Sequence, residues 1–268
     1  ASLYLYARAE ESGRKPRSSG AIRIALGSHD LDIEGCIDEA VERTVSHLDY
    51  QPIETGTYRV CFTPEAFLSL IGAFSSMFSA RAVLDGVSLS SRESLGQQLA
   101  VPFFSLEDDG LHSDHISATP FDGEGTPTQK LTLIESGCLR NFHHSEATAR
   151  AFGVQPTGHA GLGAKVSVGP DWFVVGTTPG QDSGLDLNHN RETETFVLID
   201  DLSALHAGVK ATQGSFSLPF DGWLVKGGER ISVEAATVAG DIRSLLTSIL
   251  HLEPTQEVTH PGVSPHVW

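Results

Sequence analysis

The sequence predicts an α+β protein, in which a mainly antiparallel, curved or barrel-like β-sheet packs against helices. Strand patterns dominate from Val101 to Val238, and helical patterns lie before and after that region. A chain of 268 residues with 40% hydrophobic content is long enough to bury a sizeable core. The run Thr63-Pro64-Glu65 combines a cap residue, a proline at the first helical position and a carboxylate, so it predicts the helix around which the sheet curves.

The composition excludes several classes of function. A net charge of −16 argues against non-specific binding to nucleic acid or to an anionic membrane, since both require a basic surface. No apolar run reaches the roughly 18 residues of a membrane span. The cysteines Cys36, Cys61 and Cys138 form no paired motif, which argues against a zinc knuckle or a disulfide framework and suits a reducing cytoplasm.

The first 52 residues predict the end of a preceding α/β domain. Strand patterns cover residues 2–7 and 21–26, and a helix follows from a cap at residues 30–32 to about His47. One buried face of this helix is predicted from spacing: Ile33, Ile37, Ala40, Val41, Thr44, Val45 and Leu48. The chain begins inside a strand and without Met, so we expect a piece of a longer protein, with simple removal of Met as the alternative. Gln51-Pro52 marks the boundary with a second domain, residues 53–268.

The second domain opens with a short strand at residues 58–62 and the helix that starts at Glu65. That helix carries an apolar stripe that indicates core packing rather than a cofactor site: Phe67, Leu70, Ile71, Phe74 and Phe78. Strands are predicted at 101–106, 129–134, 138–142, 172–175, 193–199, 215–218, 222–225 and 230–238. Asp108-Asp109-Gly110 reads as a turn, and Ser145 and Gly153 bound a short helix. A final helix is predicted at 241–251, followed by a loosely ordered or extended tail at 253–268.

The residues by themselves predict no metal centre. Twelve histidines include no His-x-x-x-His pair, His112 and His115 lie three apart in a turn or strand, and the neighbours His143 and His144 face opposite ways in a strand. The loop carboxylates Asp122 and Glu124 permit two interpretations. They are either an acid–base pair or caps for the loop's own backbone amides, and the neighbouring glycines Gly123 and Gly125 favour the second.

Several blocks in conserved order across residues 34–250 resemble the PmbA/TldD family. The blocks are Phe121-Asp-Gly-Glu-Gly-Thr-Pro-Thr, Leu133-Ile-Glu-Ser-Gly-Cys-Leu, Thr157-Gly158, and Gly208-Val-Lys-Ala-Thr-Gln-Gly-Ser-Phe-Ser. This resemblance implies a role in a cytoplasmic two-subunit metallopeptidase that processes unfolded peptides. The zinc-bearing TldD-like members carry a His-Glu-x-x-x-His helix just after the strand that opens the C-terminal domain, and a late cysteine ligand.

Neither zinc feature occurs at the corresponding places of this sequence. The stretch from Glu65 to Phe74 holds no histidine, none occurs between His47 and His112, and His206 stands near the expected late cysteine. The resemblance therefore implies the non-metal, PmbA/TldE-like subunit, with no catalytic residue, metal or cofactor of its own. Its partner would be a TldD-like zinc subunit or a second copy of itself. The residues predicted to contact peptide are Asp122, Glu124, Thr157, Gly158, His159 and His206.

Two alternatives stay open from the sequence. One is a self-associating peptide-binding or structural module without catalysis. The other is a self-sufficient hydrolase that uses the loop carboxylates Asp122 and Glu124. The sequence offers no basis for the DNA-gyrase link in the family's historical naming.

Overall fold

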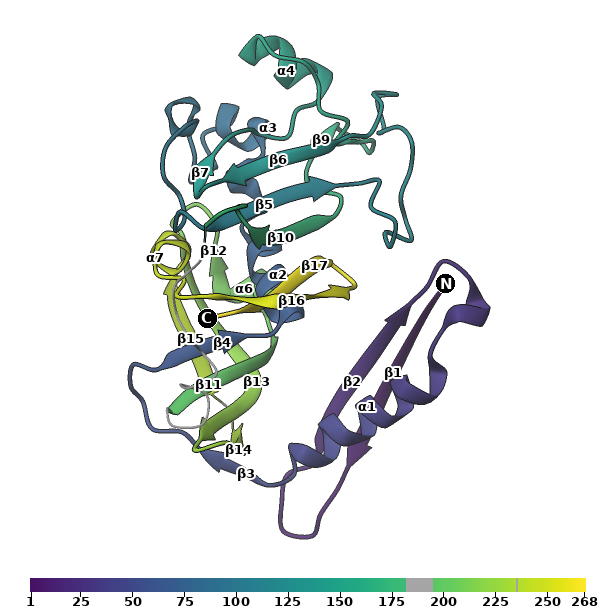
Figure 1. Ribbon diagram of the computed structural model, residues 1–268, viewed down its shortest axis with the longest axis vertical. Coiled ribbons are helices and arrows are strands. Elements are labelled where there is room, and N and C mark those ends of the chain that lie inside the picture. The colour runs from purple at the N-terminus through teal and green to yellow at the C-terminus, as the bar shows by residue number, and fades with distance from the viewer. Residues whose placement is uncertain (182–194, 235) are drawn as a thin grey trace.

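The structure is a computed structural model that describes residues 1–181, 195–234 and 236–268. It confirms the α+β class. One large sheet forms the body of the molecule, and a separate two-stranded ribbon covered by a helix lies beside its lower half, as Figure 1 shows. In the part of the chain that is described, no helix is long and apolar enough to cross a membrane.

The ribbon unit comprises β1 (Ser2–Ala9), β2 (Arg17–Ile24) and α1 (Ile33–Ser46). Asp32 caps α1, because its side chain accepts a hydrogen bond from Gly35 N at 2.9 Å. The prediction that the large apolar residues of this helix are buried is wrong, since Ile33, Ile37, Val41 and Val45 are 46–53% exposed. The small side chains Cys36, Ala40 and Thr44 face the ribbon instead, and they let α1 lie close against β2.

The large sheet is mixed, and its described strands do not close into a barrel. Its main path runs β3, β14, β13, β11, β4, β17, β10, β5, β6, β7, while β12, β15 and β16 attach at the sides. The pairs β4–β11, β10–β17 and β3–β14 are parallel. The bounds are β3 (Tyr50–Pro52), β4 (Arg59–Phe62), β5 (Phe104–Asp109), β6 (Lys130–Glu135), β7 (Cys138–Leu139), β10 (Phe173–Thr177), β11 (Thr195–Leu202), β12 (Val209–Lys210), β13 (Ser215–Lys226), β14 (Glu229–Glu234), β15 (Ala236–Asp241), β16 (Leu252–Thr259) and β17 (Gly262–Val267).

The remaining elements are short except for the helix predicted at Glu65. They are α2 (Pro64–Ala73), α3 (Ala80–Leu84), α4 (Glu146–Phe152), α6 (Leu205–Gly208), α7 (Ile242–Thr247), the 3-10 turns η1 (Ser28–Asp30), η2 (Ser75–Phe78) and η3 (Arg92–Ser94), and a two-stranded ribbon of β8 (Ala160–Gly161) and β9 (Ser167–Val168). Thr63 caps α2 as expected. The helix ends at Ala73, so Phe78 of the predicted stripe lies on η2 instead, but all five residues of the stripe are confirmed as core, since they are at most 1% exposed.

The expected loose tail is wrong. Residues 252–267 form the β16–β17 hairpin, and β17 lies between β4 and β10 in the interior of the sheet. The buried residues Val263, Ser264 and Val267 make this possible, and Trp268 packs on Phe196 with ring centroids 4.6 Å apart. Pro254 is on β16, which joins the sheet through β17 alone, so its missing N–H costs no central pairing.

Other boundaries differ more modestly from the prediction. β5 begins three residues later than expected and includes Asp108 and Asp109, for which the sequence predicts a turn. The strands expected at 215–218 and 222–225 are one continuous strand, β13, and the strand expected at 230–238 is split into β14 and β15. Helix α7 ends at Thr247 rather than at 251. Residues 193 and 194 of the strand expected at 193–199 lie outside the described residues.

Candidate functional site

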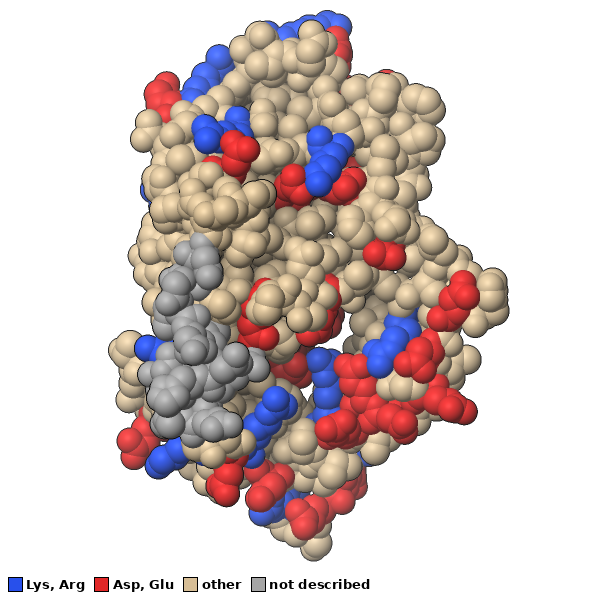
Figure 2. Space-filling model, in the orientation of Figure 1, with Lys and Arg blue, Asp and Glu red and all other residues tan. Residues whose placement is uncertain are grey.

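A cleft opens at the first turn of α2. It has a volume of about 770 Å³ and lies between the ribbon unit, the N-terminus of α2 and the tip of the β16–β17 hairpin. The charged and ring side chains that line it are Arg23, Glu39, Glu42, Arg43, Glu65, Asp200, Trp223, Arg230, Glu257, His260 and His266. Acidic groups gather on this side of the molecule, over α1, in Figure 2. The opposite side of α2 is buried in the core, so the helix presents only its first turn to the cleft.

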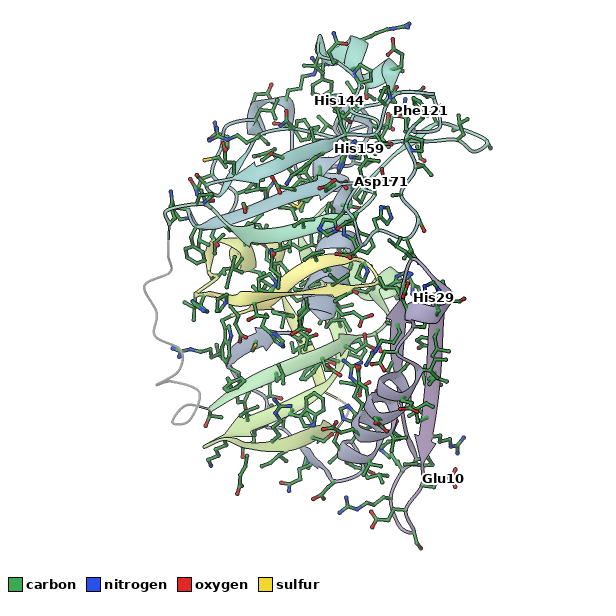
Figure 3. The ribbon with its side chains drawn as sticks, turned by 45° about the vertical axis from the view of Figure 1, so that its right-hand side comes forward. Glu10, His29, Phe121, His144, His159 and Asp171 are labelled. Carbon is green, nitrogen blue, oxygen red and sulfur yellow. The ribbon has the colours of Figure 1, made fainter. Side chains whose placement is uncertain are left out.

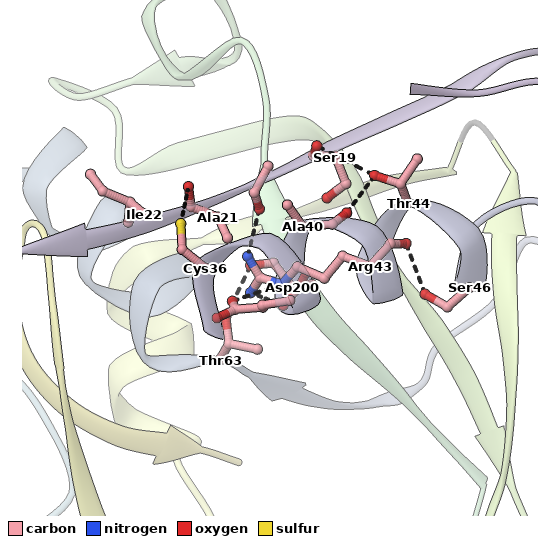
Figure 4. A network of polar contacts seen from close by, with 12 residues as sticks. Ser19, Ala21, Ile22, Cys36, Ala40, Arg43, Thr44, Ser46, Thr63 and Asp200 are labelled. Atoms are coloured by element: carbon pink, nitrogen blue, oxygen red, sulfur yellow. Dashed lines mark hydrogen bonds and ion pairs between the residues drawn. The ribbon is translucent and has the colours of Figure 1, made fainter. Parts of the chain in front are cut away.

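A polar network joins the ribbon unit to α2 and β11 at the base of this cleft. Arg43 of α1 donates to the Asp200 carboxylate at 3.0 Å and to the carbonyl of Gly20 at 3.2 Å. The Thr63 hydroxyl, which caps α2, also donates to the Asp200 carbonyl at 3.0 Å. Figure 4 shows Arg43 reaching from α1 to Asp200, which Thr63 also contacts. Arg43 therefore links three elements of the cleft wall: α1, β2 through Gly20, and β11 through Asp200.

Burial raises the pKa of two carboxyl groups of the cleft, those of Asp200 and Glu65. Desolvation raises the pKa of Asp200 to about 6, although the charge of Arg43 acts in the opposite direction. Desolvation also raises the pKa of Glu65, which is half-buried at the start of α2. Asp200, which lies beside Arg43, could exchange protons near neutral pH, and both carboxyl groups could bind the polar groups of a peptide backbone.

The raised pKa of Asp200 predicts a pH-dependent contribution to stability. Below about pH 4 the carboxyl is protonated in both the folded and the unfolded chain. As the pH rises to about 6, the unfolded chain ionises first, so about 3 kcal/mol of folding free energy is lost across this window. We expect Asp200→Asn to remove that slope. Urea unfolding of both proteins at several pH values between about 4 and 7 measures the difference. If the free energies of unfolding of the two proteins changed with pH in the same way, the raised pKa of Asp200 would be contradicted.

The loop with Asp122 and Glu124 lies at the other end of the molecule. Asp122 Oδ1 accepts hydrogen bonds from the N–H groups of Glu124 and Thr126, both at 2.9 Å, and its Oδ2 accepts from Ala160 N at 3.0 Å. Glu124 Oε2 accepts from Glu146 N at 2.7 Å, at the first turn of α4. Both carboxylates thus bind backbone N–H groups, which is the capping role that the glycine-rich sequence favoured.

Replacing Asp122 by alanine should loosen this loop. Three backbone N–H groups lose a charged acceptor, and we expect the free energy of unfolding to fall by about 2 kcal/mol, because hydrogen bonds to charged groups contribute about 1.5–3 kcal/mol each and do not add fully. Glu124→Ala is the matched control, since it removes one exposed contact and should cost less than about 1 kcal/mol. Urea unfolding compares the two. Equal losses would show that Asp122 does not organise the loop.

A fully buried Asp–His–His cluster lies behind this loop. His143 Nε2 is 2.7 Å from Asp108 Oδ2, and His159 Nε2 is 3.6 Å from the same oxygen. The Asp108 carboxylate also accepts hydrogen bonds from the N–H groups of Trp172, at 2.7 Å, and Asp171, at 3.1 Å. Figure 3 shows His159 and Asp171 near each other at the upper end of the sheet. Three segments meet here: the end of β5, the segment after β7 and the loop before β8.

The charges in this cluster are set by burial and by the partners. Desolvation raises the pKa of Asp108, but the hydrogen bond from His143 and the nearby histidine charges outweigh it, and the pKa lies below its ordinary value. Desolvation, together with His143, lowers the pKa of His159 to about 4. Asp108 is therefore ionised and His159 neutral at pH 7.

The predicted peptide contacts fall into two places. Thr157, Gly158 and His159 lie beside the Asp122 loop: Asp122, Gly158 and His159 line a cavity of about 250 Å³, and Thr157 hydrogen-bonds His159. Gly158 has φ +74°, and a Cβ there would lie 2.3 Å from the Pro127 carbonyl oxygen, so only glycine fits. His206 is exposed on α6 and lines none of the cavities described here. Whether any of these residues contacts peptide stays a prediction.

Sequence reasoning missed the cleft residues and Asp108. Asp108 was assigned to a turn, although Phe104, Leu106 and Asp108 alternate toward the core along β5. That period of two continues through Asp108, and it was the available signal. His143 was set aside because its neighbour His144 must face another way, but a single histidine can join residues from distant segments. No local signal linked Arg43 with Asp200, which are 157 residues apart.

Comparison with known proteins places the chain among peptidase relatives. The family model for the PmbA/TldA metallopeptidase C-terminal domain matches residues 55–268. The metalloprotease PmbA of Escherichia coli O157:H7 is 27% identical over 245 residues, which is 90% of this chain and 51% of that protein. The chain spans about half the length of the curated relatives it matches.

Solved structures share the fold. A proposed modulator of a DNA gyrase from Thermotoga maritima is 31% identical, with a TM-score of 0.87 over 99% of this chain and 60% of that one. TldE from Thermococcus kodakarensis has a TM-score of 0.81 at 22% identity, with the same coverage, which shows a common fold. Since the family model accounts for most of the residues, the chain belongs to the PmbA/TldD family of metallopeptidase-like proteins.

Proposed function

We propose that this chain acts as the non-catalytic, TldE-like member of a cytoplasmic two-subunit peptidase, and that it holds an extended peptide in the cleft at α2. The proposal rests on α2: this helix lies where the zinc motif is expected, but it lacks the histidine side chains that bind zinc. The helix follows β4, where the zinc-bearing relatives would place their motif, and its first turn lines a cleft. Six of its ten residues are buried, and all six are apolar.

The residues at α2 do not fit a zinc ion. A catalytic zinc site needs three protein donors within about 2.0–2.3 Å of the ion. From Pro64 to Ala73, Glu65 is the one residue with a ligand-type side chain. Within the described residues, the cleft brings no three histidine, cysteine or carboxylate donors together within 4.8 Å of one another. We therefore assign any zinc-dependent cleavage to a partner subunit.

The cleft suits the backbone of an extended peptide. It offers acceptors at Glu65 and Asp200 and donors at Arg43 and Arg230, on rigid elements. Trp223 also lines the cleft, and the ring of His47 is stacked against it with centroids 4.8 Å apart. Peptide recognition of this kind reads main-chain groups and leaves the side chains largely free, which suits varied unfolded substrates. We propose that residues 1–52 form a separate unit that serves as the cleft's second wall.

Co-expression with a zinc-bearing TldD-like protein tests this function. We expect a stable complex by size-exclusion chromatography with light scattering, and peptidase activity that requires both chains. Arg230→Glu reverses an exposed cation of the cleft and should lower kcat/KM of the complex about tenfold, equivalent to about 1.4 kcal/mol. Lys210→Glu, at an exposed cation on β12 outside the cleft, is the matched control. A partner that is fully active alone would overturn the proposal.

A further inference from the structure

We propose that Asp108, His143 and His159 form a binding site for a divalent transition metal of the zinc type, separate from the cleft at α2. Two imidazoles and one carboxylate are a donor set that zinc accepts, with a fourth position left for water. Among the described residues, these three side chains form a group whose donor atoms all lie within 4.8 Å of one another. Its residues come from other elements than α2, so the inference does not depend on the proposed peptidase role.

The spacing of the donors is close to that of a metal-bound set. Tetrahedral ligands about 2.0–2.1 Å from zinc are about 3.3 Å apart. The separations from Asp108 Oδ2 to the two Nε2 atoms are 2.7 Å for His143 and 3.6 Å for His159, on either side of that value. Side-chain adjustments of a few tenths of an ångström would therefore admit the ion.

The surroundings hold the donors in place. His159 Nδ1 is 3.0 Å from the Thr157 hydroxyl, and this contact directs the opposite ring nitrogen, Nε2, toward Asp108. Thr157 is itself fixed, since its oxygen accepts a hydrogen bond from His144 N at 2.8 Å. The Asp108 carboxylate is oriented by two backbone N–H groups. Ligating histidines commonly have a partner of this kind on their second nitrogen.

One buried atom points directly to a missing ligand. The side chain of His159 is fully buried, and its Nε2 has no hydrogen-bond partner among the described residues, although it faces Asp108. Buried polar atoms without a partner are uncommon, and an unseen ion is a recognised explanation. When a metal binds, the proton that His143 shares with Asp108 moves to His143 Nδ1, which also has no partner in the described chain. The ring stays neutral, and both Nε2 lone pairs become available.

A cavity extends from the surface of the protein to His159, one of the three ligands. His159 lines the cavity of about 250 Å³ that also includes Asp122 and Asp171. This cavity can supply the water that completes a three-ligand zinc site. His115 and His112 lie farther out, stacked against Trp172, and are not in the donor group.

The test uses the full chain, stripped with EDTA and then equilibrated with Zn²⁺ or Co²⁺. We expect about one zinc ion per chain by elemental analysis, and visible Co²⁺ absorption of a four-coordinate centre. His159→Gln should weaken zinc binding by roughly 100-fold or more, and Thr157→Ala, which leaves all three ligands in place, by about 10- to 100-fold. His112→Gln is the matched control and should bind like the unaltered chain. Zinc should raise the melting temperature of the unaltered chain and of His112→Gln.

Several outcomes would overturn the proposal. One is an unaltered chain that retains no zinc after desalting and shows no change in melting temperature. Another is a His159→Gln variant, with its fold verified by circular dichroism, that binds zinc as tightly as the His112→Gln control. If His159→Gln does not fold, Thr157→Ala decides the question, since unchanged affinity in that variant would remove the support for His159 as a ligand. In each of these cases the cluster is a hydrogen-bonded tie between three segments and no metal site.

Discussion

Asp108→Ala is expected to lower the free energy of unfolding by roughly 3–5 kcal/mol, because it removes the charged acceptor of three hydrogen bonds in a buried network. The Asp108 side chain is fully buried. It accepts hydrogen bonds from His143 and from the N–H groups of Asp171 and Trp172. Alanine leaves these donors without the carboxylate that accepts from them. Urea unfolding in EDTA, followed by tryptophan fluorescence, measures the loss without any contribution from metal.

Two further variants serve as controls: one keeps the shape of the Asp108 side chain without its charge, and the other removes the neighbouring carboxylate. Asp108→Asn keeps an oxygen for the Trp172 N–H and should lose less than the alanine variant. Asp109→Ala removes the neighbouring carboxylate, which is on the other face of β5 and accepts one weak hydrogen bond from Leu111 N at 3.3 Å. We expect that change to stay within about 0.5–1 kcal/mol. Similar losses at positions 108 and 109 would contradict the role assigned to the buried carboxylate.

Local signals in the sequence predicted the helices that start and stop at clear caps. Thr63 and Pro64 begin α2, and Ser145 begins α4 with its side chain accepting from Thr148 N. Gly153 ends α4 with φ +73°, a conformation that favours glycine. These features are decided within a few residues of chain, so reading the sequence in short windows is sufficient to find them.

The structural predictions that were wrong concern features that depend on contacts between segments far apart in the sequence. The β16–β17 hairpin looked like a loose tail because its prolines suggested disorder, but β17 gains its place from pairing with β4 and β10. The face of α1 was misjudged because spacing alone does not reveal which residues are small enough to lie against β2. In both cases tertiary packing outweighs local preference.

The candidate sites divide in the same way. The sequence drew attention to Asp122 and Glu124, and the structure places both carboxylates against backbone N–H groups. The Asp108 cluster and the Arg43–Asp200 pair were outside its reach, since their members are separated by 16 to 157 residues and no motif connects them. Only the fold brings such donors together, and a single sequence contains no direct record of that proximity.

Phe67→Ala should be the most damaging change within α2, with an expected loss of about 3–5 kcal/mol of unfolding free energy. The Phe67 ring is fully buried and lies between Phe62 of β4 and Phe104 of β5, with centroid distances of 6.3 and 6.2 Å. Removing it leaves a cavity in the middle of the core, and rigid strands on both sides limit the collapse that could fill it. Phe67→Leu keeps most of the volume and should lose much less.

The same substitution tests why α2 is placed where it is. The helix is held by its buried face, while its first turn contributes Thr63, Pro64 and Glu65 to the cleft. Ser69→Ala, at a half-buried position of the same helix, is the matched control and should stay within about 0.5 kcal/mol. If Phe67→Ala and Ser69→Ala had equal effects on urea unfolding, the buried face would not be what fixes α2. The cleft would then need another source of rigidity, of which the Arg43–Asp200 contact is the strongest candidate.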